Sequence, residues 1–314
     1  MSKCYIFLCN FNENAYLCRK KCDMEQFNIE KFARKVGGGQ RARNYLTDSM
    51  ALILDSDQMG REMFLNPEPI RVEEGRIVRV VSGRGNCRFN LEDYTLVPHD
   101  VIIIPPGFII EMLAHSADFA LEAIVVKDMP GIRQEEYANL KPTEMLYLHL
   151  EATDWQRLTA YIKLLASLLD RDPPSMLAVH HLILSCVSDL RQLASAATNP
   201  RQTVRNASRG EEKFHEFLRL ANEHGYQERN ISFYAERLLT TPNHLSAIVR
   251  QQSGQTVIQW LTQRTLMEAR ILLRHSDLMM YEIAQRLCFP EATAFGRYFK
   301  KHTGMTPLEY KNQK

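Results

Sequence analysis

The chain has 314 residues, of which 45% are hydrophobic, and a formal net charge of +2. A chain of this length can bury more than one core, so we expect about two domains. No apolar run is long enough for a signal-peptide core or a membrane span, which predicts a soluble, cytoplasmic protein that does not bind membranes. The seven cysteines show no repeated C-x-x-C pair, which argues against a disulfide framework.

Charge is distributed unevenly along the chain. Lys and Arg outnumber Asp and Glu after Thr198, whereas acidic residues are in excess before it. This asymmetry indicates a C-terminal segment that binds a polyanion, although a solvated surface would explain so small an excess equally well.

Residues 1–130 are expected to be rich in β-strands. Runs of β-branched and apolar residues predict strands at 76–82, 101–104 and 119–126. Turn signals lie between them at 83–85, 91–93, 98–100 and 105–107. Short strands at this spacing are typical of a sandwich or a small barrel.

Residues 131–197 change to a helical period, and two helices are expected there. Their apolar stripes recur at spacings of three and four, at Trp155, Leu158, Ile162, Leu165 and Leu169, and at Leu177, His181, Leu184, Val187, Leu190 and Leu193. We expect this segment to form a homodimer. Packing within one copy of the chain would explain the same stripes.

Residues 198–210 are polar, contain Pro and Gly, and carry three arginines four residues apart, which predicts a linker. Its arginines either contact phosphate or are solvated. Residues 211–314 then show only helix signals. Asn230 and Thr256 are expected to cap helices, and Thr241 followed by Pro242 opens another that ends near Gly254.

A repeat lies within this last segment, where residues 235–260 align with residues 284–310 after one inserted turn residue. Ala235, Arg237, Leu238, Leu245, Val249, Gly254, Thr256 and Trp260 match Ala284, Arg286, Leu287, Phe295, Phe299, Gly304, Thr306 and Tyr310. Each copy predicts a short helix, a tight turn and a second helix, which is the helix-turn-helix unit used twice.

The second helix of each copy has one apolar and one polar face. Leu245, Ile248 and Val249 are expected to point inward, as are Phe295, Tyr298 and Phe299. The opposite faces hold Asn243, Ser246, Ala247 and Arg250 in the first copy, and Thr293, Gly296, Arg297 and Lys300 in the second. Small residues allow close approach, and an arginine can bond two guanine acceptors in the major groove of DNA.

The helix between the copies, residues 257–274, is expected to span about 27 Å. One turn of DNA is roughly 34 Å. Such a helix could hold both second helices in successive major grooves, so that one chain contacts two adjacent half-sites of double-stranded DNA.

The stretch from about Phe214 to Lys311 resembles the DNA-binding domain of the arabinose-operon regulator (AraC) family, through EIAQRLCF, FGRYFKKHTGMTPLEYK and the linking ARILL. The resemblance implies a seven-helix domain that inserts two recognition helices into DNA. It implies base-reading positions at Asn243, Ser246, Ala247, Ala292, Thr293, Gly296 and Arg297. We expect phosphate contacts from Arg250, Lys300 and Lys301.

Three positions depart from the family pattern. Cys288 lies where the family usually has a turn glycine, and Met279 where it usually has a polar N-cap. Ala247 replaces a frequent arginine, so we expect the first recognition helix to specify fewer base pairs.

The β-rich segment resembles the cupin-like barrel that many members of the family carry for effector binding. HDVIIIPPGFIIEM is similar to the second cupin motif, with Pro106 and Gly107 retained. Ile110 lies where a metal-binding cupin has histidine, and His99 and His115 are wrongly spaced for a metal site. A cupin enzyme fused to a DNA-binding domain is therefore the disfavoured alternative, and no metal or cofactor is expected.

A second alternative comes from Cys4, Cys9, Cys18 and Cys22. A DNA alkylation-repair sensor joins a zinc-bound cysteine cluster to this type of DNA-binding domain, although the spacing here fits poorly. The preferred interpretation is a sequence-specific transcriptional regulator without catalytic activity. Its expected architecture is α+β and multidomain, with a cupin-like barrel, a helical dimerisation segment and an all-α DNA-binding domain. We expect an activator that binds RNA polymerase and responds to a small-molecule effector, which the sequence does not identify.

Overall fold

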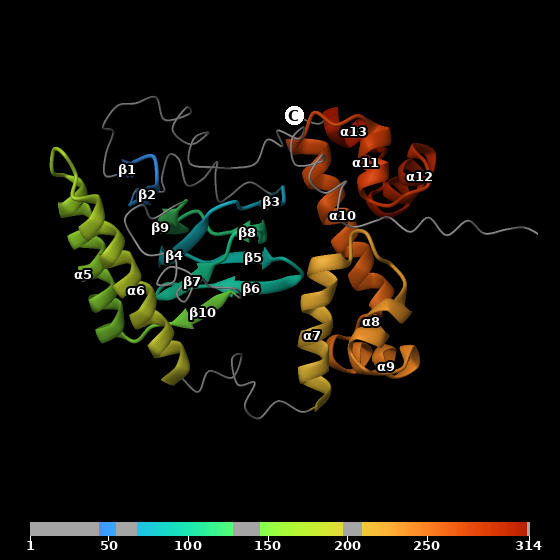
Figure 1. The fold of residues 1–314 in the computed structure, drawn as a ribbon, viewed down its shortest axis with the longest axis horizontal. Helices are drawn as coiled ribbons and strands as arrows, with labels where there is room; N and C mark the ends of the chain where they lie inside the picture. Colours follow the sequence, from blue (N-terminus) through green and yellow to red (C-terminus); the bar gives the residue numbers. More distant parts are fainter. Residues whose placement is uncertain (1–43, 55–67, 128–144, 197–208, 313–314) are drawn as a thin grey trace, which may run out of the picture. The chain divides into compact units, whose positions relative to one another are not determined.

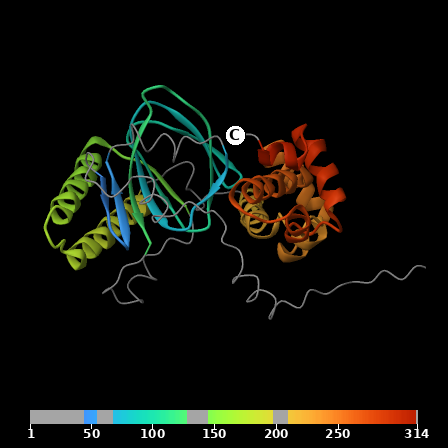
Figure 2. The same cartoon turned by 90° about the horizontal axis from the view of Figure 1, so that it is seen from above.

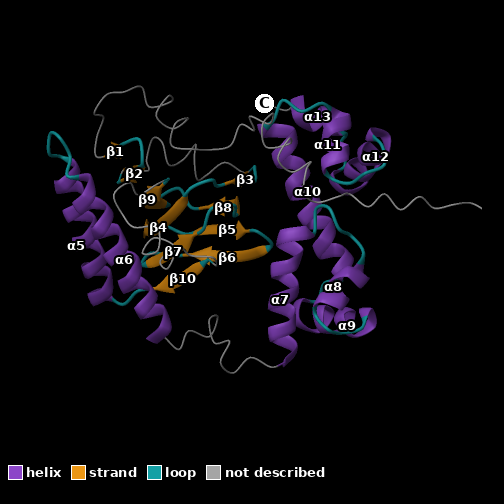
Figure 3. Cartoon of the chain, viewed as in Figure 1, coloured by secondary structure: helices purple, strands orange, loops and turns teal. Residues whose placement is uncertain are grey.

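The computed structural model describes residues 44–54, 68–127, 145–196 and 209–312. Among the described elements, all β-strands come before the helices in the sequence, and the last described part is helical throughout (Figures 1 and 3). The chain divides into two compact units, with the boundary inside α10 (Val257–His275) after Met267.

The strands form two antiparallel sheets. One has the order β1-β2-β9-β4-β7-β10 and the other β3-β8-β5-β6. The strand bounds are Asn44–Leu46 for β1, Met50–Ile53 for β2, Ile70–Arg71 for β3, Gly75–Ser82 for β4, Gly85–Phe89 for β5, Glu92–Leu96 for β6, Asp100–Ile104 for β7, Ile109–His115 for β8, Ala120–Val126 for β9 and Leu146–His149 for β10. The strands expected at 76–82, 101–104 and 119–126 are confirmed as β4, β7 and β9.

The six-stranded sheet is covered on both faces, which explains why its central strands are almost continuously apolar. On β4, Val78 and Val80 belong to the core shared with the second sheet, whereas Ile77 belongs to the core shared with helices α5 and α6. Figure 2 shows these two helices beside the sheets. The period of two along a strand therefore separates two cores.

Helices α5 (Ala152–Leu169) and α6 (Met176–Ala196) confirm the two helices expected in this segment. The predicted stripe of α5 is buried at Leu158, Ile162, Leu165 and Leu169, in one core with the sheet. The α6 stripe begins later than expected, because Leu177 and His181 are exposed and Val179, His180 and Ile183 are buried instead. The stripe that suggested a dimer is thus largely covered within one copy of the chain.

A strand lies within the segment that was expected to be helical. β10 pairs with β7 in antiparallel register, Leu148 opposite Val101, and forms an edge of the six-stranded sheet. Four residues are too few for a clear alternating pattern, and the pairing with a distant strand is what stabilises this conformation.

The remaining helices are α7 (Arg209–His224), α8 (Ile231–Arg237), α9 (Pro242–Ser253), α10, α11 (Met280–Arg286), α12 (Ala292–Thr303) and α13 (Pro307–Asn312). The expected caps are confirmed. The Asn230 side chain accepts from the Ser232 N–H, and Thr241 Oγ1 accepts from the His244 N–H. Gly254 ends α9 in the left-handed conformation, with φ of 70°.

Some predictions fall on residues outside the described ranges. These are the cysteines Cys4, Cys9, Cys18 and Cys22, and nearly all of the linker 198–210. Within the described ranges, no helix combines the length and the apolar character needed to cross a membrane.

The turns after α8 and α11 have the same backbone geometry but lack glycine. Leu239 has φ of 48° and Cys288 has φ of 53°. The next N–H closes each turn, from Thr240 to the Ala235 carbonyl at 2.9 Å and from Phe289 to the Ala284 carbonyl at 2.8 Å. Residues with a Cβ are disfavoured in this conformation, so both turns are strained.

We predict that Leu239→Gly raises the free energy of unfolding by about 0.5 to 1 kcal/mol, because the left-handed conformation costs glycine little. Leu239 is 91% exposed, so the substitution removes almost no buried surface. Urea unfolding of the full chain measures the change. Leu308→Gly is the matched control: Leu308 is 59% exposed within α13, and glycine there should destabilise by about 1 kcal/mol. Destabilisation by Leu239→Gly would contradict the strained turn.

Candidate nucleic-acid interface

Helix α9 buries one face against α7 and α8 and exposes the other. Leu245, Ile248 and Val249 are buried, as the sequence predicted. The exposed residues on the opposite side include all four that were expected there: Asn243, Ser246, Ala247 and Arg250. We call these four residues the outward face of α9.

Helix α12 is built in the same way against α11 and α13. Phe295 and Phe299 are buried, and their rings contact Phe289 and Tyr310 at centroid distances of 5.5 Å and 5.4 Å. Tyr298, which was expected to point inward, is only half-buried. The outward face of α12 consists of Thr293, Gly296, Arg297 and Lys300, with Ala292 and Lys301 at its borders. Among these six, Ala292 and Gly296 are half-buried and the others are exposed.

The C-terminal ends of α9 and α12 are closed by equivalent hydrogen bonds. The Gly254 N–H donates to the Arg250 carbonyl, and the Gly304 N–H donates to the Lys300 carbonyl, both at 2.9 Å.

The helices that follow begin with the same capping box. Gln259 Oε1 accepts from the Thr256 N–H, and Glu309 Oε2 accepts from the Thr306 N–H, both at 2.7 Å. The hydrogen bonds from Thr306 lower the pKa of the Glu309 carboxyl. The outward faces of α9 and α12 are therefore followed by the same local backbone structure, which we call the frame of each helix.

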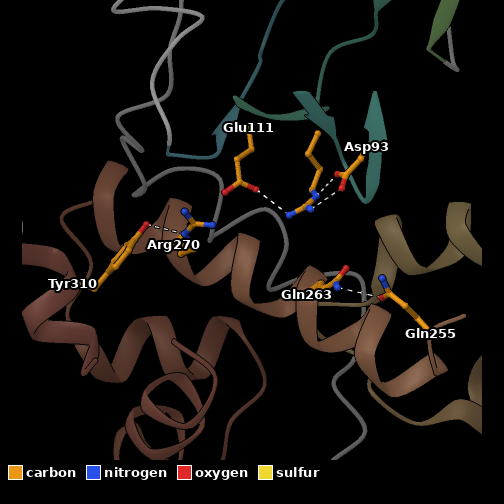
Figure 4. A network of polar contacts seen from close by, with 7 residues as sticks. Asp93, Glu111, Gln255, Gln263, Arg270 and Tyr310 are labelled. Atoms are coloured by element: carbon orange, nitrogen blue, oxygen red, sulfur yellow. Dashed lines mark hydrogen bonds and ion pairs between the residues drawn. The ribbon is translucent and has the colours of Figure 1, made fainter. Parts of the chain in front are cut away.

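Contacts behind each outward face hold this frame in place. Trp260 Nε1 donates to Ser253 Oγ at 3.0 Å, which ties α10 to the end of α9. Gln263 Nε2 donates to Gln255 Oε1 at 3.2 Å (Figure 4). In the other unit, Arg270 Nε donates to the Tyr310 hydroxyl at 2.9 Å (Figure 4).

The two outward faces differ in charge. The only Lys or Arg of α9 is Arg250, whereas α12 carries Arg297, Lys300 and Lys301. Arg297 is 81% exposed, and its Nη2 lies 3.9 Å from Glu291 Oε1. Glu291 is the N-cap residue of α12, but its side chain accepts no capping hydrogen bond. The sequence did not predict this contact, because the position of Glu291 beside Arg297 depends on the extended backbone at the N-cap.

Small side chains allow close approach to both helices at the same repeat position. A Cβ added at Gly296 would meet no atom within 4 Å, so the fold does not require glycine there. In α9 the matching residue is Ser246, whose hydroxyl donates to the Pro242 carbonyl at 2.9 Å. The Ser246 donor is therefore occupied by its own helix.

The histidines of the β-rich part are engaged in packing and hydrogen bonding. The His99 ring stacks on Trp155 at 4.7 Å, and His149 Nδ1 lies 2.8 Å from Oδ1 of the buried Asp100. Across the described ranges, no group of three His, Cys, Asp or Glu residues could hold a metal ion. Ile110 is buried in the core between the sheets.

The described cysteines differ in their chemistry. Burial raises the pKa of the Cys87 and Cys186 thiols to about 12, which disfavours the nucleophilic thiolate. Cys288 is exposed, in the turn before α12. Polar contacts in the β-rich part serve the sheet: Arg88 pairs with Asp93 at 2.6 Å and with Glu111 at 3.5 Å (Figure 4).

Comparison with known proteins assigns a family to the helical part. The model of a helix-turn-helix domain family matches residues 234–313. This region is a helix-turn-helix domain of the arabinose-regulator type. The arabinose operon regulatory protein of Escherichia coli (strain K12) is 29% identical over 82 residues, which cover 26% of this chain and 28% of that protein.

Two further relatives are transcriptional regulators by name. The uncharacterised regulator YpdC of Escherichia coli (strain K12) is 28% identical over 142 residues, 45% of this chain and 48% of that protein. The transcriptional activator RhaR of Cronobacter sakazakii is 41% identical over 69 residues, 22% of this chain and 24% of that protein. The chain therefore spans about half the length of the first relative and about a quarter of the second.

We predict that Gly296→Ala stabilises the fold but weakens DNA binding. Alanine is favoured over glycine within a helix by about 1 kcal/mol, and its Cβ would enter open space. Because the same Cβ would stand where DNA approaches the helix, affinity should fall several-fold. Thermal unfolding and a fluorescence anisotropy titration measure the two effects. Unchanged affinity in the stabilised variant would show that nothing approaches α12 at Gly296.

Proposed function

We propose that this protein is a sequence-specific DNA-binding transcriptional regulator, an activator without catalytic activity, and that α9 and α12 are its two recognition helices. The observation that carries the proposal is the repeated outward face. Two helices in matching frames each bury an apolar face and expose small or polar residues together with a cation. Such a surface fits the major groove, where base edges are read.

The proposed contacts divide into base reading and backbone binding. Base edges are assigned to the outward residues of the first turns, Asn243, Ser246 and Ala247 on α9, and Ala292, Thr293, Gly296 and Arg297 on α12. Phosphate is assigned to the cations farther along the helices, Arg250, Lys300 and Lys301. The chain carries two such helix pairs, one before and one after α10 in the sequence. Two adjacent half-sites in double-stranded DNA are the expected target.

The β-rich part is proposed to be a cupin-like effector domain. Its two antiparallel sheets around one apolar core support this assignment. The effector would bind without metal, since the described histidines are engaged elsewhere. Thermal shift of the full chain against small molecules, with a chelator present, tests the assignment. A shift that chelation abolishes would contradict it.

A homodimer through α5 and α6 also remains a proposal, as does contact with RNA polymerase. Because the sheet covers the main stripe of α5, the proposed contact uses the apolar side chains that stay exposed, Leu164 at 49% and Leu177 at 53%. Sedimentation of the full chain and of Leu164→Glu tests it. A monomer at all concentrations would rule out the dimer.

We predict that Arg297→Ala and Lys300→Ala weaken binding in different ways. Arg297→Ala should cost roughly 1 to 3 kcal/mol and relax the preference at one base pair, if its guanidinium bonds a guanine. Lys300→Ala should weaken all sequences alike and reduce the slope of log affinity against log salt by about one, because it removes one phosphate contact. Anisotropy titrations over a salt series, on operator variants, separate the two effects.

Both substitutions remove exposed side chains, so circular dichroism and thermal unfolding should match the wild type. Arg219→Ala is a matched control, because Arg219 on α7 is exposed and lies 3.9 Å from Glu216, as Arg297 lies from Glu291. It should leave base preference unchanged. If a folded Arg297→Ala protein keeps the wild-type preference at every position, Arg297 does not read a base.

A further inference from the structure

Among the outward residues assigned to base edges, the larger polar side chain lies at a different position in each helix. Aligning the repeat places Asn243 on Thr293 and Ala247 on Arg297. In α9 the larger polar residue, Asn243, lies in the first turn, and Ala247 follows four residues later. In α12 the short residue comes first and the arginine follows. All four side chains are exposed.

This exchange is not a consequence of a different fold. Each preceding turn contains one residue in the left-handed conformation, Leu239 or Cys288, although the second turn is one residue longer. The C-caps and the capping boxes after the helices use equivalent hydrogen bonds. A cation occupies the same position in each helix, Arg250 or Lys300, and a small residue occupies another, Ser246 or Gly296. The shared position of one cation and the shared position of one small residue favour a similar approach of each helix to its own stretch of DNA.

Other residues near the start of α9 are less suited to read bases. His244 lies on the side of α9 that lines an open hollow with Glu236, Thr241 and the turn residue Leu239. The Ser246 hydroxyl already donates to the Pro242 carbonyl. Asn243 is therefore the outward residue of α9 whose side chain offers both a free donor and an acceptor near the helix start.

Asn243 and Arg297 differ in chemistry as well as in position. An asparagine amide can pair with N6 and N7 of adenine, and an arginine guanidinium with O6 and N7 of guanine. A shift of four residues moves a side chain by about 6 Å along the helix axis. Since base pairs are about 3.4 Å apart, this corresponds to between one and two base pairs.

We propose that the chain reads two unlike subsites: adenine through Asn243 in the subsite at α9, and guanine through Arg297 in the subsite at α12. When the two subsites are superposed, the guanine of the α12 subsite lies one to two base pairs away from the adenine of the α9 subsite. This inference rests on the proposed function and names the bases that the regulator recognises. A direct repeat of one half-site would be a poor operator for this chain.

The test is a residue exchange that gives α9 the arrangement of α12. The full-length protein with Asn243→Thr and Ala247→Arg is compared with the wild type by selecting bound DNA from a random pool. In the α9 subsite the adenine preference should disappear, and a guanine preference of about 10-fold to 100-fold should appear one to two base pairs away. The α12 subsite should not change.

The reciprocal exchange, Thr293→Asn with Arg297→Ala, should replace guanine by adenine in the other subsite. His244→Ala is the control and should leave both preferences as they are. Thermal unfolding confirms that each variant folds, and a variant that fails to fold is replaced by the single substitution Ala247→Arg, which should add a guanine to the α9 subsite.

The outcomes distinguish a failure of the proposed function from a failure of the base assignments. If the wild-type protein enriches no sequence, the proposed function is wrong. If it enriches a sequence, but the exchanged protein selects the same bases at the same positions, the proposed function stands and the assignment of Asn243 and Arg297 to adenine and guanine is overturned. The same base in both wild-type subsites, at equivalent positions, would overturn it as well.

Discussion

The burial of one face of α9 and of α12 fixes the rotation of each helix about its own axis, and the rest of the interface depends on this rotation. Leu245 and Val249 in α9, and Phe295 and Phe299 in α12, are almost completely inaccessible to water. A rotation of either helix would expose them, and each buried side chain contributes roughly 1.5 to 3 kcal/mol. Which residues face outward is therefore decided by the core.

The turns show that tertiary packing outweighs local preference in both pairs. Leu239 and Cys288 adopt a conformation that favours glycine, although no glycine is present. Their neighbours Leu238 and Leu287 are buried at 3% and 0% exposure, which holds each turn in place. The second pair also lacks a polar N-cap at Met279, but Glu282 Oε2 accepts from the Met279 N–H at 2.7 Å and satisfies part of the helix start. The departures from the family pattern are thus tolerated without a change of fold.

Sequence patterns predicted the helical part better than the β-rich part, for a physical reason. Caps such as Asn230 and Thr241 act within a few residues, so their effect is local and visible in the sequence. Strand β10 depends on pairing with β7, and the position of the buried stripe on α6 depends on its packing in one core with the sheet and α5. Neither contact leaves a local signal.

The outward residues could be predicted because the repeat supplied two independent views of one helix. The prediction was wrong where the two copies differ. Tyr298 was expected to point inward like the matching residue Ile248, but only Ile248 is buried. The carboxylate of Glu291 was missed, since its position relative to Arg297 depends on the extended backbone at the N-cap, with φ of −157°. The hydrogen bond from the Ser246 hydroxyl to the Pro242 carbonyl could not be predicted from the sequence either, because a serine hydroxyl has several partners within reach.

The difference in charge between the two outward faces has a consequence for how each half would contribute to binding. Affinity for DNA is dominated by contacts with phosphate, and α12 offers three cations where α9 offers one. Contacts with base edges add discrimination but are individually modest. A protein built in this way would be held mainly through its second helix pair, while the first pair, with Asn243 and two small neighbours, discriminates among sequences that the second has already bound. Raising the salt concentration would then weaken the half at α12 more than the half at α9, because screening acts on charge and leaves neutral hydrogen bonds largely unchanged.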